Sequence, residues 1–309
     1  MPDVIDPVAL LGLLAAPLAA CVILTGIHCY LGIHVLMREV IFVDLALAQI
    51  AGMGMAFGVL FGVMPATPQG YLVALSFTLV GAAIFALGRF RDRRVPQEAV
   101  IGIVYAVSSA VAILALSKTA IESDEIENML VGRLLFVGWT EVAVTTVIYA
   151  AIGVIHIFFR RRFFAISHHG ADAGSGLSVK LWDFLFYATF GVVVTSSVKM
   201  AGVLLVFCFL IVPAACAMMF FRSVRARLLA GWGLGLLGSV LGLTASALWD
   251  LPTGAAIVAA FGALFLACAA FYAVIGRKIT TTPTQRPDQA PDSEPRLKPG
   301  SAMEVGATR

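Results

Sequence analysis

Asp44 and Gln49 interrupt one of the most apolar stretches of this sequence. Beyond the charged pair Arg38 and Glu39, the segment REVIFVDLALAQIAGMGMAFGVLFG is otherwise apolar. A carboxylate inside a membrane costs about 2.5–3.5 kcal/mol on insertion scales, and such residues line ion paths or pair with a partner. Asp44 is therefore interpreted either as lining an ion path or as forming an ion pair with a base such as Arg38. Gln49 either lines the same path or bonds a neighbouring helix.

The other reactive residue types form no catalytic or metal-binding pattern. The five histidines contain no pair at the helical spacing of metal ligands, and the five cysteines lie in apolar runs without a CxxC motif. The sequence contains no P-loop, so the chain is not expected to bind nucleotide phosphates itself. HExxH, GxSxG and the kinase signatures are also missing. These patterns predict a transport subunit without enzymatic activity or a bound cofactor.

Membrane-spanning helices are the elements expected to position these residues. The chain is 60% hydrophobic and only 13% charged, with a mean hydropathy of +0.96, whereas a soluble protein is about 25% charged. A bilayer core about 30 Å thick requires about 20 helical residues. We predict an all-α polytopic transmembrane bundle over residues 1–278, with eight or nine spans near 8–30, 41–64, 71–88, 98–118, 138–158, 182–198, 201–220, 229–248 and 254–275.

The number of spans is eight or nine because the spans near 182–198 and 201–220 are not clearly separate. They are divided by SSVKMAG, which is either a tight external turn or the break of a re-entrant pair. Within this region Lys199 lies at a membrane edge, where a lysine can extend its charge to water. Pro213 lies inside an apolar run and is expected to kink its helix.

Arginine-rich loops predict the orientation of the chain. Such loops are cytoplasmic by the positive-inside rule, and with nine spans all of them fall on one side: Arg89–Arg94, Arg160–Arg162, Arg222–Arg227 and Arg277–Lys278. The N-terminus is then outside and the C-terminus inside. Residues 279–309 are rich in Pro, Thr and charge, and they are predicted to form a disordered cytoplasmic tail.

Two loops depart from plain membrane composition. Arg160–Asp183, RRRFFAISHHGADAGSGLSVKLWD, is either a short helix beneath the bilayer with Gly-rich flanks or a simple connector. The external stretch 119–128 contains Glu122, Asp124, Glu125 and Glu127, which form either a cation-attracting patch or an ordinary solvated loop. Glu98 is expected to cap the start of its helix, where the dipole is positive.

Several segments resemble, in order and spacing, the membrane-permease subunits of bacterial zinc/manganese-type ABC importers. The likeness extends over residues 10–275, and SVKMAGVLLVFCFLIVPAACA matches the family pattern nearly residue by residue. MREVIFVDLALAQIAGMGMAFG, QEAVIGIVYAVSSA, LVGRLLFVGWTEV and SALWDLPTGAAIV are similar to further family segments. The positions matching structural family motifs are Glu98, Gly102, Lys199, Gly202, Pro213, Asp250, Pro252 and Gly254.

The resemblance implies partners for this chain. Phe164–Val179 aligns with the family loop that docks on a separate ATP-binding subunit, which would carry out ATP hydrolysis. Two permease copies would form the pathway in the bacterial inner membrane, and an extracytoplasmic metal-binding protein would deliver the ion. The residues expected to couple to the ATPase are Phe164, Ser167, Gly170, Ala171, Gly174, Gly176 and Leu177.

One departure from the family leaves the substrate open. Related permeases carry an Asp-x-x-x-His pair, but the position four residues after Asp44 is Ala48, and Gln49 follows. On an ideal helix Gln49 lies about 140° from Asp44. Imidazole suits zinc, whereas oxygen ligands suit harder ions such as manganese. The expected function is import of a divalent transition metal ion (zinc or manganese, with iron as a further candidate). The alternatives are import of a metal chelate or vitamin by the same machinery, or an ion-gradient-driven secondary carrier.

Overall fold

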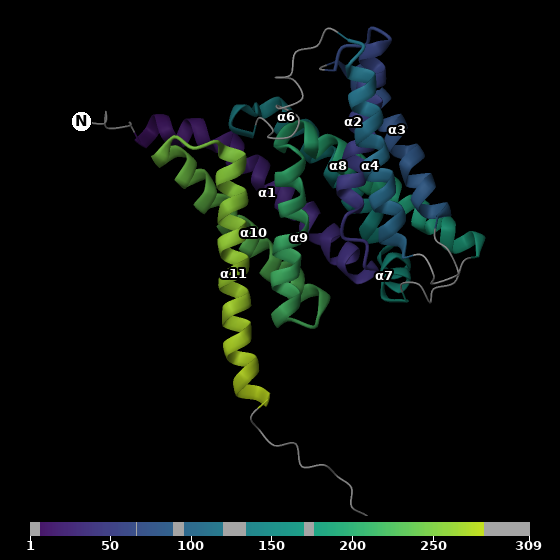
Figure 1. The fold of residues 1–309 in the computed structure, drawn as a ribbon. Helices are drawn as coiled ribbons and strands as arrows, with labels where there is room; N and C mark the ends of the chain where they lie inside the picture. The colour runs from purple at the N-terminus through teal and green to yellow at the C-terminus, as the bar shows by residue number, and fades with distance from the viewer. Residues whose placement is uncertain (1–6, 66, 89–95, 120–133, 170–175, 281–309) are drawn as a thin grey trace, which may run out of the picture. The chain divides into compact units, whose positions relative to one another are not determined.

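The computed structural model describes residues 7–65, 67–88, 96–119, 134–169 and 176–280, and its described regular elements are helices (Figure 1). Residues 1–272 form one compact unit and residues 273–309 a separate one, of which only the end of the last helix is described. The acidic stretch Glu122–Glu127 and most of the predicted tail lie outside the described residues.

Nine helices in the described part of the chain are long and apolar enough to cross a membrane, which confirms the larger of the two predicted counts. The chain is therefore a multi-pass membrane protein. A short helix, α7 (Arg160–His169), and a single 3₁₀ turn, η1 (Leu134–Phe136), complete the described elements. The nine helices are α1 (Pro7–Arg38), α2 (Val43–Leu60), α3 (Pro68–Leu87), α4 (Gln97–Leu116), α6 (Trp139–Phe158), α8 (Leu177–Ala201), α9 (Val203–Phe220), α10 (Val224–Trp249) and α11 (Thr253–Thr280).

The connection between α8 and α9 differs from the predicted loop. Residues 196–201 continue α8, so only Gly202 separates the two helices and the predicted span 182–198 was too short at both ends. Gly202 has φ 77° and ψ 161°, a conformation that is essentially restricted to glycine. This one residue therefore supplies the sharp turn visible between the two helices (Figure 1).

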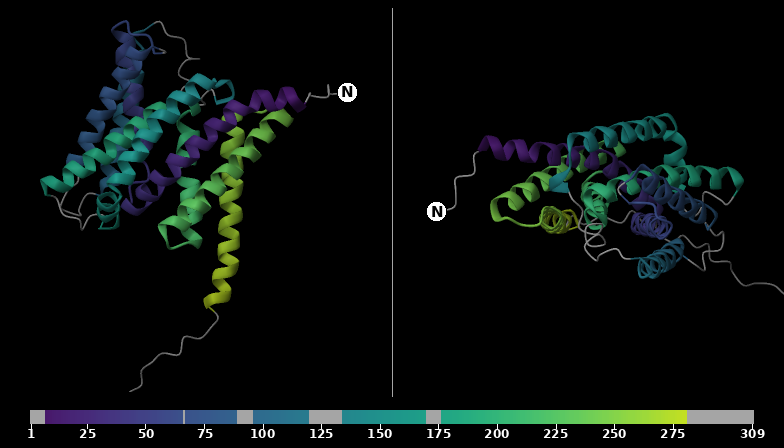
Figure 2. Two further views of the ribbon diagram at one scale, coloured as in Figure 1. Left: turned by 180° about the vertical axis from the view of Figure 1, so that it is seen from behind. Right: turned by 90° about the horizontal axis from the view of Figure 1, so that it is seen from above.

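The helices of the larger unit pack in two sets. α1 packs against α9 and α10, whereas α2 packs against α3 and α4, and α3 packs against α8 (Figure 2). Close approach depends on small residues: a Cβ added to Gly32 of α1 would collide with the carbonyl oxygen of Leu210 in α9. Membrane helices commonly pack in this way, because glycines allow the backbones of two helices to approach closely.

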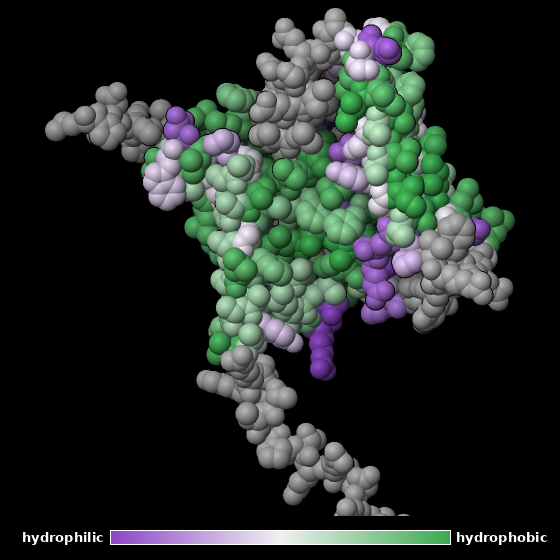
Figure 3. All heavy atoms as spheres, viewed as in Figure 1, coloured by the Kyte–Doolittle hydropathy of each residue, from purple (hydrophilic) through white to green (hydrophobic). Residues whose placement is uncertain are grey.

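Apolar side chains also cover the outward-facing helix surfaces. Figure 3 shows this cover over most of the visible face, with hydrophilic residues near the helix ends. Ile113 of α4, Val147 of α6 and Leu266 of α11 are among the well-exposed examples. An apolar surface of this kind suits the hydrocarbon core of a membrane. Each helix satisfies its backbone hydrogen bonds internally and therefore needs no water there.

Candidate functional site

Asp44 lies in the first turn of α2 and is almost completely enclosed. Asp44 is only 1% exposed, and its Oδ1 atom has no hydrogen-bond partner among the described residues. Cys208 of α9 lies close enough to interact electrostatically with the carboxyl group. A buried carboxylate oxygen without a partner is costly, so it favours the approach of a cation or a proton.

Arg38 does not neutralise Asp44. Its Nη1 atom instead donates to Oδ1 of Asp183 in α8 at 2.8 Å, and both side chains are nearly buried. The Arg38–Asp44 ion pair, which was the alternative interpretation of Asp44, is therefore not formed. The role of Asp44 in an ion path stays a prediction.

Gln49 faces a different neighbour from Asp44. Its Oε1 atom accepts a hydrogen bond of 2.9 Å from the hydroxyl group of Ser109 in α4. This contact agrees with the angular separation expected for residues five apart on a helix, and it confirms that Gln49 bonds a neighbouring helix. A contribution of Gln49 to the path stays a prediction.

The loop predicted to couple the chain to an ATPase contains a helix. α7 covers Arg160–His169, so the predicted short helix is confirmed, while its position beneath the bilayer stays a prediction. Gly176 directly precedes α8 as its N-cap residue, and Leu177 is 76% exposed. Gly170, Ala171 and Gly174 lie outside the described residues.

Ser167 and Phe164 connect α7 to the end of α1. The Ser167 hydroxyl group bonds Nδ1 of His34 at 2.8 Å and accepts from Nε of Arg38 at 2.8 Å. The ring of Phe164 lies 4.2 Å from that of His34. Ser167 is fully buried, so it faces the helix bundle and not the solvent.

Four residues thus join α1, α7 and α8 in one buried hydrogen-bonded group. The guanidinium group of Arg38 is central, because it bonds both Ser167 and Asp183 and stacks over Phe186 at 3.9 Å. Hydrogen bonds that involve a charged group contribute more than neutral ones. We call this group the α1–α7 anchor, and its members are His34, Arg38, Ser167 and Asp183.

Sequence reasoning did not identify the anchor. The available signal was the spacing of His34 and Arg38, which are four residues apart and therefore share one face of a helix. Their partners come from positions about 130 residues or more further along the chain. No local pattern indicates such a pairing.

Glu98 has a different role from the predicted helix cap. The N-cap position of α4 is Pro96, which makes no side-chain cap bond. The Oε1 atom of Glu98 instead accepts from the backbone N–H of Ile41 at 2.7 Å. Ile41 lies in the connection between α1 and α2, so this hydrogen bond joins that connection to the start of α4.

The remaining motif positions lie at helix ends or on helix surfaces, except for Pro213, which lies inside a helix. Asp250 ends α10 in the left-handed conformation with φ 51°, and α11 begins at Thr253 just after Pro252, so this motif forms the turn between the two helices. Lys199 is exposed in the last turn of α8, and Gly102 is exposed on α4. Pro213 is buried inside α9, which runs from Val203 to Phe220 without interruption.

Three buried histidines share a polar seam along α1, α6 and α8. His28 bonds the hydroxyl group of Ser197 at 3.0 Å, and His156 bonds that of Thr189 at 2.9 Å. Over the part of the chain that the structure describes, no three His, Cys, Asp or Glu side chains gather in a group that could hold a metal ion. Each of the three imidazoles bonds at least one hydroxyl group, although Nε2 of His34 has no hydrogen-bond partner among the described residues.

The ABC 3 transport family matches residues 12–272, which is most of the chain. With this match, the nine membrane-crossing helices of the described chain and the short helix between two of them are those of a membrane permease of the ABC transporter class. This chain belongs to the ABC 3 transport family.

Named relatives and a solved structure agree with this assignment. The manganese transport system membrane protein MntC of Listeria monocytogenes is 26% identical over 204 residues, covering 63% of this chain and 72% of MntC. The high-affinity zinc uptake system membrane protein ZnuB of Haemophilus influenzae is 24% identical and covers 79% of this chain and 92% of ZnuB. PsaBC from Streptococcus pneumoniae, solved in complex with Fab, has the same fold, with a TM-score of 0.68 at 22% identity over 83% of this chain and 90% of that chain.

Proposed function

We propose that this chain is the membrane subunit through which an ATP-driven importer passes a divalent transition metal ion. The transported ion is zinc or manganese, with iron as a further candidate. Family membership over residues 12–272 carries the proposal, and relatives named for manganese and zinc transport support the substrate class. The partnerless Oδ1 of Asp44 supports a cationic cargo, because a cation would compensate that buried charge.

The proposed assembly has several protein components. Two copies of this chain form the pathway, a separate subunit binds and hydrolyses ATP, and an extracytoplasmic protein delivers the metal. Nothing resident on this chain is proposed as a cofactor. The cytoplasmic side carries α7 and the basic loops, the N-terminus lies outside and the C-terminus inside, in the bacterial inner membrane.

α7 supports coupling to the ATP-binding subunit. It lies between the spans α6 and α8, and its inner face is fixed to α1 by Ser167. A force applied to α7 by a bound subunit would reach α1 through the anchor. Leu177, at the start of α8, is exposed and free to contact that subunit.

Reconstituted uptake tests the proposal. The chain and a candidate ATP-binding subunit are placed in proteoliposomes, and the uptake of zinc, manganese and iron is followed with and without ATP. Uptake of at least one ion that requires ATP and the partner subunit is expected. Uptake without ATP would indicate a secondary carrier, and failure to bind any candidate ATP-binding subunit would contradict the assembly.

A metal chelate or vitamin is the second candidate substrate. Ala48 occupies the position where related permeases carry histidine, and that departure favours a cargo whose metal is already coordinated. Uptake of a chelated metal that exceeds uptake of the free ions in the same vesicles would support this alternative.

A further inference from the structure

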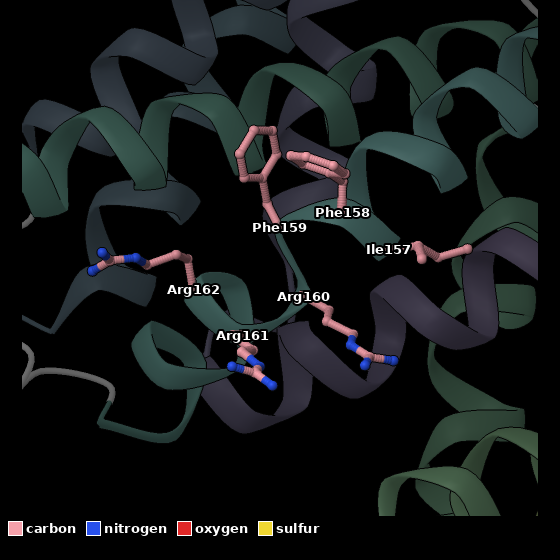
Figure 4. Close-up of a pocket in the computed structure, with 6 residues that line it drawn as sticks. All are labelled: Ile157, Phe158, Phe159, Arg160, Arg161 and Arg162. Atoms are coloured by element: carbon pink, nitrogen blue, oxygen red, sulfur yellow. The ribbon is translucent and has the colours of Figure 1, made fainter.

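The elbow between α6 and α7 places three consecutive arginines beside an exposed apolar helix end. α6 ends at Phe158 and α7 begins at Arg160, with Phe159 between them. A cavity of about 560 Å³ lies at this elbow (Figure 4). We call it the elbow cavity, and it is lined by Ile157, Phe158, Phe159, Arg160, Arg161 and Arg162.

The arginines of the elbow cavity have no described counter-charge. All three are exposed, and Figure 4 shows their side chains spread around the start of α7. Among the residues that the structure describes, no carboxylate forms a salt bridge with Arg160, Arg161 or Arg162. The first turn of a helix is the positive end of its dipole and has unpaired N–H groups, so cations there are unfavourable unless an anion joins them.

The other wall of the elbow cavity is apolar. Phe158 is 80% exposed and Ile157 is 69% exposed, and both belong to the spanning segment of α6. The ring of Phe159 lies 5.1 Å from that of Trp182 in α8, and such aromatic residues are typical of the boundary between hydrocarbon and water. The cavity therefore has an apolar side toward the membrane and a basic side beyond it.

We propose that the elbow cavity binds the headgroup of an anionic phospholipid. Arg160 and Arg161 contact the phosphate group, for which the planar guanidinium group is suited, while Phe158 and Ile157 lie against the acyl chains. Arg162 extends away from these two arginines (Figure 4). Basic residues next to a spanning helix attract anionic lipids. A free phosphate ion or an acidic protein segment would account for the arginines but not for the exposed apolar wall.

Lipid bound at this place would also stabilise α7. The arginines lie in its first turn, and its second half carries Ser167 of the α1–α7 anchor. The helix would then be fixed at one end by lipid and at the other by α1. The binding itself does not depend on which substrate the chain transports.

Retention of lipid by the purified full chain tests the proposal. The chain is taken from nanodiscs that contain equal phosphatidylglycerol and phosphatidylcholine, and retained lipids are counted by native mass spectrometry. The unmodified chain is expected to retain phosphatidylglycerol selectively. The double variant R160Q/R161Q should reduce this retention about tenfold or more, because each arginine near the surface contributes separately to attraction of anionic lipid.

A matched double variant in another basic loop provides the control. Arg222 and Arg225 are also exposed, so R222Q/R225Q removes the same charge elsewhere and should leave retention unchanged. Equal losses in both variants, or no loss in either, would overturn the proposal. Equal displacement of lipid by inorganic phosphate would indicate a free-anion site. Loss of ATP-binding-subunit attachment in R160Q/R161Q, with lipid retention intact, would indicate a protein contact instead.

Discussion

Asp44 combines two properties that rarely occur together at a single residue. Its side chain is enclosed by helices, and one of its carboxylate oxygens has no hydrogen-bond partner in the described structure. Arg38, the nearest basic residue along the chain, is already bound to Asp183 and Ser167. Arg38 therefore does not compensate a charge on Asp44, and the proposed cation would do so.

Replacing Asp44 with asparagine should reduce metal uptake while preserving the fold. Asn keeps the shape of the side chain but removes its charge, so we expect a fall of at least about tenfold, the loss found even for groups that only support a metal ligand. Uptake of zinc, manganese and iron at low concentration is the measurement. Asp250→Asn, at an exposed helix end, is the control and should transport normally. Unchanged uptake of every ion would contradict a role of Asp44 in the path.

Ser167 allows the anchor to be tested with a small change. Ser167→Ala removes the hydroxyl group that His34 and Arg38 share, which leaves buried polar atoms unpaired at a cost of about 1–3 kcal/mol. We expect faster hydrogen exchange in α7 and less substrate transported per ATP hydrolysed. Ser76→Ala, at an exposed position of α3, should change neither quantity. Normal exchange in α7 of the Ser167 variant would show that the anchor does not hold this helix.

At the scale of the helices, contact distance is set by small residues. α1 approaches α9 so closely that Gly32 has no space for a side chain, whereas Gly26, six residues earlier on the same helix, has no atom within 4 Å of an added Cβ. The two glycines therefore differ only in what faces them.

The pair Gly32→Ala and Gly26→Ala separates packing from helix propensity. The first variant forces α1 and α9 apart and should destabilise the protein by about 1–3 kcal/mol, the usual cost of overpacking. The second should be neutral or slightly stabilising, since alanine favours a helix over glycine by about 0.5–1 kcal/mol. Thermal inactivation in detergent gives the comparison. Equal stability of both variants would mean that α1 and α9 separate without cost.

At the scale of the whole chain, the proposed topology has an odd number of spans and therefore has the two termini on opposite sides of the membrane. The single-residue turn at Gly202 makes α8 and α9 two separate helices, and the count of nine in the described chain depends on it. In this proposed topology α7 and the arginine-rich loops of the sequence lie on the cytoplasmic side. The proposed ATP-binding subunit would contact α7 there.

Labelling of single added cysteines should show this orientation directly. Leu177→Cys, at the start of α8, is expected to react only from the cytoplasmic side, and Leu251→Cys, in the turn after α10, only from outside. Both positions are exposed, so accessibility does not limit the reaction. An impermeant maleimide applied to intact cells and to inverted vesicles provides the measurement, with the unmodified chain as background. Reaction of Leu177→Cys in intact cells would invert the topology and remove the proposed contact with an ATP-binding subunit.

The sequence by itself determined the fold class and the span count to within one, and it singled out Asp44, whose role in an ion path stays a prediction. Long apolar runs specify helices in a bilayer because the backbone can satisfy its hydrogen bonds only within the chain, and an isolated charge in such a run is conspicuous. The short helix α7 could also be predicted, from the change in composition around Arg160–Asp183.

Tertiary structure alone decided which polar groups meet. Arg38 pairs with Asp183 and not with Asp44, Glu98 bonds Ile41 instead of capping its own helix, and Gln49 bonds Ser109. Each contact joins residues distant in sequence, and its formation depends on the rotation and approach of whole helices. Composition and periodicity describe one helix at a time, so they contain no information about those rotations.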